Sequence, residues 1–424
     1  MKEIKLSTQS YKGVRDFYPE DAAVQDYIFT TWSKTAKAFG FARFDASLLE
    51  LAELYKAKGA ENAEMVNEQT YTFIDRGERE VTLRPEMTPS VARMIAAKKR
   101  DLQFPVRWYS IPNLFRYERP QRGRLREHWQ LNCDIFGGDE LAGDIESIAL
   151  AHQLLLDFGA APKMFEVRVN NRQEMRSLYE NLGIKDPATQ NKITQLNDRF
   201  HKLPRAEYCT QLEALIGADT AQKVLALLEN PESSLATREL VNGLFELGIT
   251  NVKIDRSLAR GFNYYTGTIF EIFDVSGENN RSLLGGGRYD NLTALFSEDS
   301  VSGVGFGMGD VTMRDFLETH ALLEGRVKSI APTLVIIPAD PSHNLAALKI
   351  AQVFRQREIS TAVDTGEKKL GKKISDAAGA SILYALVVGQ DELQSNTYTL
   401  KNLPQSTSEE GTLDTLLTSL IVAL

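Results

Sequence analysis

Residues 115–136 read Phe-Arg-Tyr-Glu-Arg-Pro-Gln-Arg-Gly-Arg-Leu-Arg-Glu-His-Trp-Gln-Leu-Asn-Cys-Asp-Ile-Phe, an arginine-rich loop followed by an alternating strand. Five arginines and one glutamate fall between positions 116 and 126. From residue 128 onward, apolar residues alternate with polar ones, so one face of the strand suits a core. The polar face carries His128, Gln130, Asn132 and Asp134. Because the guanidinium fork matches phosphate oxygens, loop and strand together predict a phosphate-binding pocket rather than a solvated loop.

The segments around this stretch indicate an antiparallel sheet. A helix is expected at about residues 21–39, where apolar residues recur every three or four positions before Gly40. Short β-rich segments follow without a helix between each pair, which is typical of an α+β domain. We expect strands at residues 81–83, 106–111, 128–136, 165–169, 265–273 and 304–307.

Two changes of pattern along the chain predict the domain organisation. Residues 171–248 are mostly helical in character, and strand-like sequence resumes at Val252, which indicates a helical insertion. Near residue 329 the pattern changes to strand, helix, strand, helix, strand, with strands at 334–337, 361–363 and 384–388. We therefore predict a first, α+β domain over 1–328, with the insertion inside it, and a small α/β domain with mostly parallel strands over 329–424.

Composition excludes several classes of protein. Lys and Arg total 49 against 57 Asp and Glu, and the net charge of −8 excludes a uniformly basic nucleic-acid coat. Two cysteines and five scattered histidines do not make a metal site or a disulfide framework. No apolar run approaches the roughly 20 residues of a membrane span, and residues 1–10 do not resemble a signal peptide. A cytoplasmic protein is expected.

Three further segments carry candidate ligand-binding groups. Glu86 and Thr88, in Arg-Pro-Glu-Met-Thr, suit capture of an ammonium group, although the same pattern could cap a helix. The segment 257–271 sets Arg260 before a glycine and two adjacent tyrosines. In a two-residue period the tyrosines point to opposite faces, unless the strand begins with a bend. Glycine-rich turns at 285–287 and 303–309 allow close approach of a ligand, but neither is a P-loop or a dinucleotide fingerprint.

Taken in order, these segments resemble the class II aminoacyl-tRNA synthetases, and specifically the histidyl-tRNA synthetase family. The resemblance covers nearly the whole chain, from the opening segment 13–17 to a tail similar to the family's anticodon-binding domain. Segment 115–126 matches motif 2 of class II enzymes, and 260–271 matches the histidine motif. The resemblance implies that histidine and ATP form histidyl-adenylate, and that the histidyl group then passes to tRNA(His).

The resemblance also implies roles for single residues. Arg116 and Arg260 would neutralise the α-phosphate as catalytic cations, and Gln130 would lie near the carboxylate of histidine. Asp134 and Tyr265 would contact the two imidazole nitrogens, since a neutral imidazole offers one donor and one acceptor. The residues implied to bind histidine are Glu86, Met87, Thr88, Arg116, Gln130, Asp134, Arg260, Tyr264 and Tyr265; those implied to bind ATP are Arg116, Glu118, Arg124, Arg126 and Gln130.

The sequence departs from the family pattern at the end of motif 3. Thr312 stands where the family usually has an arginine for the γ-phosphate. Arg314 lies two residues later, and two helical positions turn a side chain about 200° away. We expect Arg124 or Arg126 to carry more of the contact with the outer phosphates.

The resemblance further implies a homodimer with the first helix, at about residues 21–39, and the strand after it at the interface. It also implies Mg²⁺ bound with ATP and not at a fixed protein site. One alternative is the regulatory subunit of ATP phosphoribosyltransferase, which binds histidine without activating it. That branch typically lacks the arginine before glycine and the C-terminal domain, and both are present here. A second alternative, a nucleic-acid-binding protein with a degenerate synthetase core, would have lost the pocket residues that this chain retains.

Overall fold

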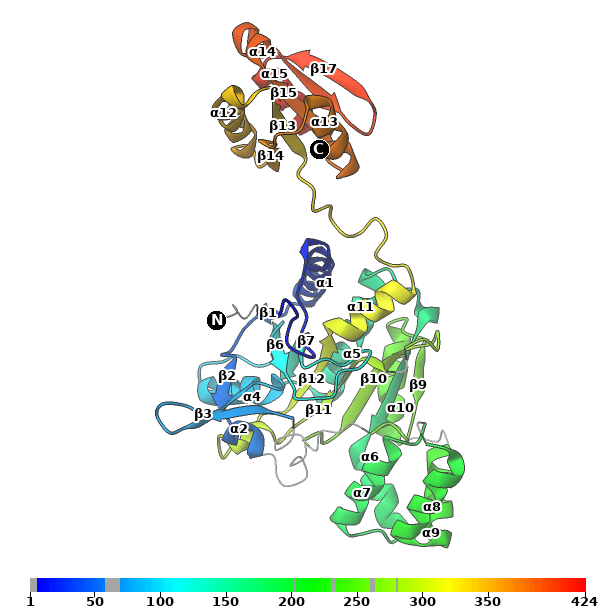
Figure 1. The fold of residues 1–424 in the computed structure, drawn as a ribbon. Coiled ribbons are helices and arrows are strands. Elements are labelled where there is room, and N and C mark those ends of the chain that lie inside the picture. Colours follow the sequence, from blue (N-terminus) through cyan, green and yellow to red (C-terminus); the bar gives the residue numbers. More distant parts are fainter. Residues whose placement is uncertain (1–5, 58–68, 202, 230–233, 260–263, 280) are drawn as a thin grey trace. The chain divides into compact units, whose positions relative to one another are not determined.

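The computed structural model describes residues 6–57, 69–201, 203–229, 234–259, 264–279 and 281–424. The chain divides into two compact units, Met1–Arg326 and Val327–Leu424 (Figure 1). None of the helices in the described ranges is long and apolar enough to span a membrane.

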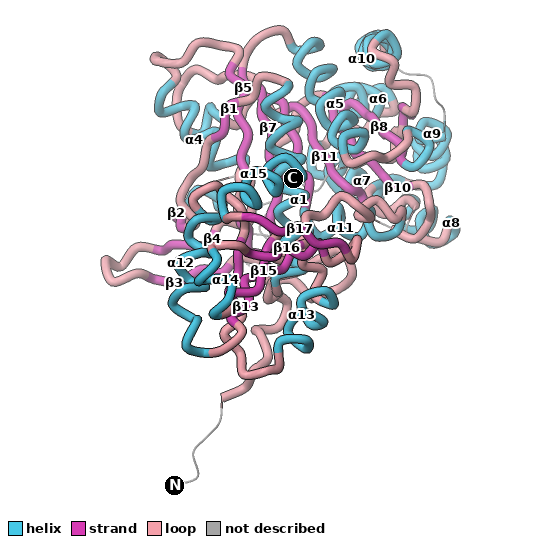
Figure 2. The backbone as a smooth tube through the Cα atoms, turned by 90° about the horizontal axis from the view of Figure 1, so that it is seen from above, coloured by secondary structure: helices cyan, strands magenta, loops and turns pink. Residues whose placement is uncertain are grey.

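A large, mostly antiparallel sheet forms the centre of the first unit (Figures 1 and 2). Its order is β1-β5-β7-β12-β11-β10-β8-β9, and β6 pairs with one end of β7. Only the edge pairs, β1 with β5 and β8 with β9, are parallel. The strands are β1 (Ala42–Arg43), β5 (Val106–Ser110), β6 (Asn113–Phe115), β7 (Glu127–Phe136), β8 (Phe165–Asn171), β9 (Val252–Ile254), β10 (Thr268–Asp274), β11 (Ser282–Arg288) and β12 (Gly303–Gly309).

Three helices cover one face of this sheet and pack into the main core. They are α1 (Pro19–Ala38), α5 (Glu140–Asp157) and α11 (Asp310–Thr319). The apolar face of β7 packs into this core through Leu131, Cys133 and Ile135, as the alternation predicts. Trp32 of α1 is fully buried, and its indole N–H donates to Met308 Sδ at 2.9 Å. The polar face of β7 is therefore turned to the opposite side.

A small sheet and a helix lie on the side of the polar face. The small sheet has the order β2-β4-β3, from β2 (Leu49–Leu51), β4 (Glu80–Leu83) and β3 (Tyr71–Ile74). A short helix, α2 (Glu53–Lys56), follows β2, and α4 (Thr88–Lys98) follows β4. Val91, Ala92 and Ile95 of α4 pack in a second core with Tyr265 and Ile269. The turn between β4 and α4 is thereby held against the segment that precedes β10.

The predicted helical insertion is present, and four of its helices share a core of their own. That core contains Tyr179, Ile193, Tyr208 and Val224. The last helix of the region differs, because its Leu240 and Leu244 belong to the main core of the first unit. The helices are α6 (Arg172–Asn181), α7 (Pro187–Asn197), α8 (Arg205–Ile216), α9 (Ala218–Glu229) and α10 (Leu235–Glu246).

The second unit has a five-stranded sheet of order β14-β13-β15-β16-β17. The three strands expected from sequence are parallel, and they pair as β14-β13-β15. An antiparallel hairpin, β16-β17, extends the sheet and was not predicted. The elements are β13 (Leu334–Pro338), α12 (Asn344–Arg355), β14 (Thr361–Val363), α13 (Leu370–Gly379), β15 (Tyr384–Val388), α14 (Gln390–Ser395), β16 (Tyr398–Asn402), β17 (Thr407–Gly411) and α15 (Leu413–Ala423).

Candidate active site

The turn between β4 and α4 places Glu86 inside the protein. Glu86 is 3% exposed, and Tyr264 donates its hydroxyl to Glu86 Oε2 at 3.2 Å. Arg84 fixes the start of the turn by donating to the carbonyl oxygen of Ala46 at 2.6 Å. Met87 is fully buried, and Thr88 is the first residue of α4. Two residues 178 positions apart, Glu86 and Tyr264, are thus brought into contact.

Arg116 connects motif 2 to this turn. It follows β6 directly, and its Nε donates to the carbonyl oxygen of Pro85 at 2.9 Å. Its backbone N–H donates to the carbonyl oxygen of Arg126 at 2.9 Å, so the two ends of the arginine-rich loop are joined at this point. The structure therefore places Arg116 beside the Glu86 turn, as a shared binding site requires.

Asp134 is a buried carboxylate on the polar face of β7, 2% exposed. The Tyr289 hydroxyl donates to Oδ1, whereas Oδ2 is buried and has no hydrogen-bond partner among the described residues. Burial raises the pKa of Asp134 to about 7, and the hydrogen bond from Tyr289 opposes this shift. A buried polar atom without a partner is costly, so Oδ2 is well placed to accept a hydrogen bond from a ligand.

Glycines of two neighbouring strands keep the sheet beside Asp134 free of side chains. Gly305 of β12 pairs with Asp134 on one side and with Gly287 of β11 on the other. A Cβ on Gly305 would lie 2.4 Å from Asp134 Oδ1, and one on Gly287 would lie 2.8 Å from Tyr265 Cδ1. A Cβ on Gly307 would lie 2.6 Å from the side-chain Cδ of Gln130.

The interpretation of residues 285–287 as a turn is wrong, whereas the strand expected at 304–307 is confirmed. Residues 285–287 lie within β11, and residues 303–309 make up the whole of β12. Their glycines leave room for the side chains of Gln130, Asp134 and Tyr265 above the strands. These glycines are needed because they leave space above the sheet, and not because they form a turn.

Three tyrosines gather near Asp134. The ring centroids of Tyr264 and Tyr265 are 4.8 Å apart, and Tyr289 lies 5.9 Å from the first and 6.4 Å from the second. β10 begins only at Thr268, so the tyrosine pair precedes the strand and does not follow its alternation. Tyr289 was not predicted as a site residue. Its position directly after the glycine-rich run, in the segment Gly-Gly-Gly-Arg-Tyr-Asp at 285–290, was the available signal.

The arginine-rich loop holds itself in place through its own charged and aromatic residues. Arg124 Nε lies 2.7 Å from Oε2 of Glu118, whose side chain is largely buried. Arg126 donates to the Tyr11 hydroxyl at 2.8 Å, and its guanidinium lies 4.1 Å from the ring centroid of Tyr117. Desolvation, Arg116 and neighbouring arginines lower the pKa of His128 to about 3, so this imidazole is neutral.

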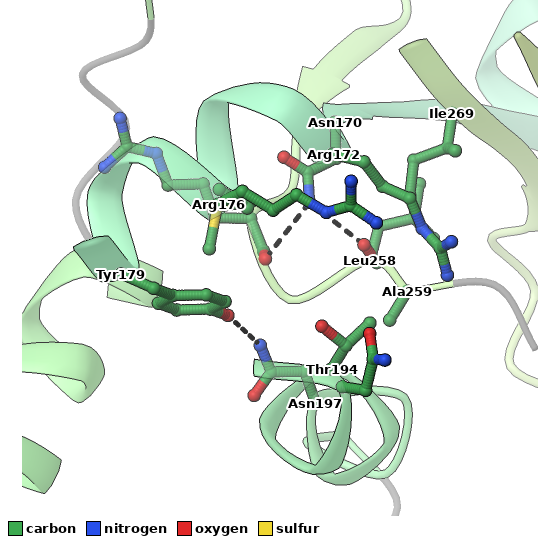
Figure 3. A pocket seen from close by; sticks show the side chains of 12 residues that line it. Asn170, Arg172, Arg176, Tyr179, Thr194, Asn197, Leu258, Ala259 and Ile269 are labelled. Carbon is green, nitrogen blue, oxygen red and sulfur yellow. Dashed lines mark hydrogen bonds between the residues drawn. The ribbon is translucent and has the colours of Figure 1, made fainter. Parts of the chain in front are cut away.

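Arg260 lies outside the described residues, but the segment leading to it is firmly held. Asn170 of β8 donates its side-chain amide to the carbonyl oxygens of Arg256 at 3.2 Å and Leu258 at 2.9 Å (Figure 3). A cavity of about 30 Å³ separates this segment from α7 of the insertion. Residues 256–259 therefore have a fixed path on the edge of the insertion.

A sequence profile described as histidyl-tRNA synthetase matches residues 13–310, and an anticodon-binding-domain profile matches residues 333–421. The chain belongs to the histidyl-tRNA synthetase family. The histidine–tRNA ligase of Leptospira biflexa is 41% identical over 420 residues, covering 95% of each chain. That of Thermoplasma volcanium is 36% identical, covering 97% of this chain and 98% of its own.

Solved structures agree with this family at the level of the fold. The histidyl-tRNA synthetase from a Nostoc species matches with a TM-score of 0.80 at 22% identity, over 99% of this chain and all of its own. A Bacillus halodurans structure described as an ATP phosphoribosyltransferase regulatory subunit/histidyl-tRNA synthetase matches with a TM-score of 0.71 at 19% identity, covering 91% of this chain and 99% of its own. The predicted family, α+β fold class and synthetase class are confirmed.

The glycine at position 305 should be intolerant of even one methyl group. A Cβ there would lie 2.4 Å from Asp134 Oδ1 and 2.5 Å from the carbonyl oxygen of Cys133, a backbone atom that cannot rotate away. We expect Gly305→Ala to lower the unfolding free energy by about 1–3 kcal/mol, a typical cost of overpacking. Gly309→Ala is the control in the same strand, because its Cβ would meet nothing nearer than 3.6 Å. Equal urea midpoints for the two variants would contradict the close approach.

Proposed function

We propose that this chain is a histidine–tRNA ligase that activates histidine with ATP and transfers it to tRNA(His). The observation that carries the proposal is the buried Asp134 carboxylate, with one oxygen bonded by Tyr289 and the other without a described partner. Such a group needs a ligand that donates a hydrogen bond, and an imidazole N–H does so. The family of the chain supplies the reaction class.

The imidazole of histidine would bind between Asp134 and Tyr265. Oδ2 of Asp134 would accept from one ring nitrogen, and Tyr265 would contact the other. Tyr264 and Met87 would line this part of the pocket. The α-ammonium group would bind at Glu86 and Thr88, which the β4–α4 turn holds near Tyr264.

The carboxylate of the bound histidine would then react with ATP. A carboxylate oxygen attacks the α-phosphorus, the bond from phosphorus to the bridging oxygen breaks, and pyrophosphate leaves with that oxygen. Arg116 and Arg260 would neutralise the charge that builds on the α-phosphate, and Gln130 would orient the carboxylate. Such catalysis relies on positioning and on fixed charges, which rigid cations provide.

ATP would lie along the motif 2 loop, where Glu118, Arg124 and Arg126 are candidate contacts. Magnesium would enter as the ATP complex, as part of the substrate. In the parts of the chain that the structure describes, no group of three or more His, Cys, Asp or Glu side chains could hold a metal ion.

The regulatory-subunit alternative is the second candidate function, and the tail of the chain disfavours it. An anticodon-binding profile matches residues 333–421, and a subunit that only senses histidine has no use for such a domain. The same unit would read the anticodon of tRNA(His), and the helical insertion would approach the acceptor arm. A cytoplasmic location stays a prediction.

Lys368, Lys369, Lys372 and Lys373 follow the i, i+1, i+4, i+5 spacing that predicts one basic helical face suited to RNA phosphates, but the face in the structure is smaller than this spacing indicates. Lys373 is only 6% exposed and donates to the carbonyl oxygen of Asp364 at 3.0 Å. Lys368 and Lys372 both form ion pairs with Asp376, at 2.6 and 2.8 Å. Exposed ion pairs exchange readily, so these two lysines stay available to RNA phosphates, whereas Lys373 does not.

A homodimer is part of the proposal, and the small sheet supports it. Leu49, Leu51 and Phe73 are 46%, 44% and 48% exposed, respectively, and register places them on one face of β2, β4 and β3. Val81 lies between Leu51 and Phe73 on that face. Contiguous exposed apolar side chains are typical of protein–protein interfaces. A second copy would contribute this face together with α1.

Histidine-dependent exchange between ATP and pyrophosphate tests the proposed activity. The intact protein should catalyse exchange with histidine and with no other amino acid. Arg260→Ala should lower the rate by roughly 100-fold or more, the usual loss of a group that stabilises transition-state charge. Arg238→Ala, which removes an exposed arginine of α10, is the matched control and should behave as the parent. If the parent protein catalyses no exchange, the proposed ligase activity is excluded. If Arg260→Ala keeps full exchange activity, the proposed role of Arg260 at the α-phosphate is excluded.

The proposed imidazole contact should depend on pH through Asp134. With its pKa raised to about 7, this carboxyl is ionised above pH 7 and gains a proton below it. Asp134→Asn should raise the histidine KM by about 10- to 100-fold at pH 8.5, the loss expected for a charged hydrogen bond. The ratio of variant to parent KM should shrink towards pH 5.5, and taking this ratio cancels the titration of histidine itself. A constant ratio would contradict the proposed contact.

Removal of the second unit should separate the two steps of the reaction. A chain ending at Arg326 keeps the whole first unit, whose core contains no residue beyond that point. Pyrophosphate exchange should stay within a few-fold of the parent, whereas charging of tRNA(His) should fall by about 100-fold or more through lost RNA contacts. Steady-state measurement of both activities checks this. Equal loss of both would argue against a separate role for the second unit.

A further inference from the structure

The arginine that the family places at the end of motif 3 has no substitute on α11. Thr312 stands at this position, and its hydroxyl donates to the carbonyl oxygen of Leu283 at 3.2 Å. Arg314, the next arginine along the helix, forms ion pairs of 2.8 Å with both Asp21 and Glu318. The guanidinium of Arg314 is therefore directed to α1 and to its own helix. A cation for the outer phosphates must come from another element.

A cavity of about 400 Å³ lies beside Thr312. The motif 2 loop, the segment before β11 and the start of α11 all line it, which makes it an extension of the proposed ATP site. Two arginines, Arg122 and Arg281, and two carboxylates, Glu278 and Asp315, face it. Arg122 is exposed and donates to the side chain of Asn279 at 3.3 Å.

Arg281 lies directly across Gly123 of the motif 2 loop. A Cβ built on Gly123 would be 2.9 Å from Arg281 Cδ and 3.5 Å from Thr312 Cγ2, so this glycine lies between the two side chains. Gly123 has a φ of +72°, and it is followed by Arg124, which pairs with Glu118. The Arg281 side chain therefore lies beside the same glycine as the Thr312 side chain.

The surroundings of Arg281 are those of an anion-binding cation. Among the described residues its guanidinium has no hydrogen bond and no ion pair. Burial lowers the pKa of Arg281, nearby Arg124 lowers it further, and Glu118 opposes both. An arginine stays charged in spite of such a shift. A partly desolvated cation next to another cation is stabilised when an anion binds between them.

We propose that Arg281 binds the outer phosphate groups of ATP, in place of the arginine that Thr312 replaces. This inference rests on the proposed adenylation reaction. In that reaction Arg281 holds the β- and γ-phosphates while the bond between the α-phosphorus and the bridging oxygen breaks. It then stabilises the charge on the departing pyrophosphate. Arg281 takes no proton and forms no covalent bond.

Calorimetric titration of the full chain with ATP and with AMP, in the absence of histidine, tests this role without turnover. We expect Arg281→Met to weaken ATP binding by about 10- to 100-fold, the loss of a charged hydrogen bond. AMP binding should change less than about twofold, because AMP lacks the outer phosphates; this selectivity separates a phosphate contact from general damage to the fold. Arg281→Lys keeps the charge without the planar fork and should lie between Arg281→Met and the parent.

Arg314→Met is the matched control. It removes one positive charge from the same region, from a side chain directed to α1, and should leave the affinities for ATP and AMP near those of the parent. Unchanged ATP binding in Arg281→Met, or equal weakening of ATP and AMP, would overturn the proposed contact. Absence of ATP binding by the parent would overturn it as well. If the parent binds ATP normally but catalyses no histidine-dependent exchange, the proposed ligase activity is excluded. The proposed contact between Arg281 and the outer phosphates is then still supported by the binding data.

Discussion

The candidate site depends on a carboxylate that the fold buries and only half satisfies. Asp134 sits at the centre of the largest sheet, where one oxygen accepts from Tyr289 and the other faces no described partner. Burying a carboxylate in this way costs free energy, which is why its pKa rises to about 7. The cost is offset when a ligand donates a hydrogen bond. The arrangement also requires a glycine at position 305 of β12, since a Cβ there would lie 2.4 Å from Oδ1 of the carboxylate.

Much of the fold could be predicted because its signals are local. The alternation of apolar and polar residues over 128–136 correctly predicted the two faces of β7. A strand with one buried face has an apolar residue at every second position, and this pattern is visible in the sequence. The helical insertion also follows from pattern alone. The hairpin β16-β17 was missed because β17, Thr407–Gly411, is polar and mostly exposed, and its pairing with β16 depends on backbone hydrogen bonds.

Contacts between distant segments could not be predicted in the same way. Tyr289 reaches Asp134 across 155 positions of the chain, and no spacing rule connects them. Lys373 looked like part of a basic face, yet it turns inward because Asp364 at the end of a neighbouring strand offers it a carbonyl oxygen. The alternation of a strand does not apply to Tyr264 and Tyr265, because both residues precede β10, which begins at Thr268. In each case tertiary packing decides the orientation of a side chain that local sequence leaves free.

The same distinction explains how a phosphate site can survive the loss of an arginine. What the triphosphate requires is positive charge at a point in space, and the chain position that supplies it is immaterial. Arg281 stands 31 positions before Thr312, but Gly123 lies between their side chains and is close to both. In the proposed arrangement, an acidic protein of net charge −8 would bind ATP through cations of the motif 2 loop and through Arg281, directly before β11. The fold, and not one segment of sequence, brings these cations together. The absence of the motif 3 arginine is therefore poor evidence that phosphate binding is lost.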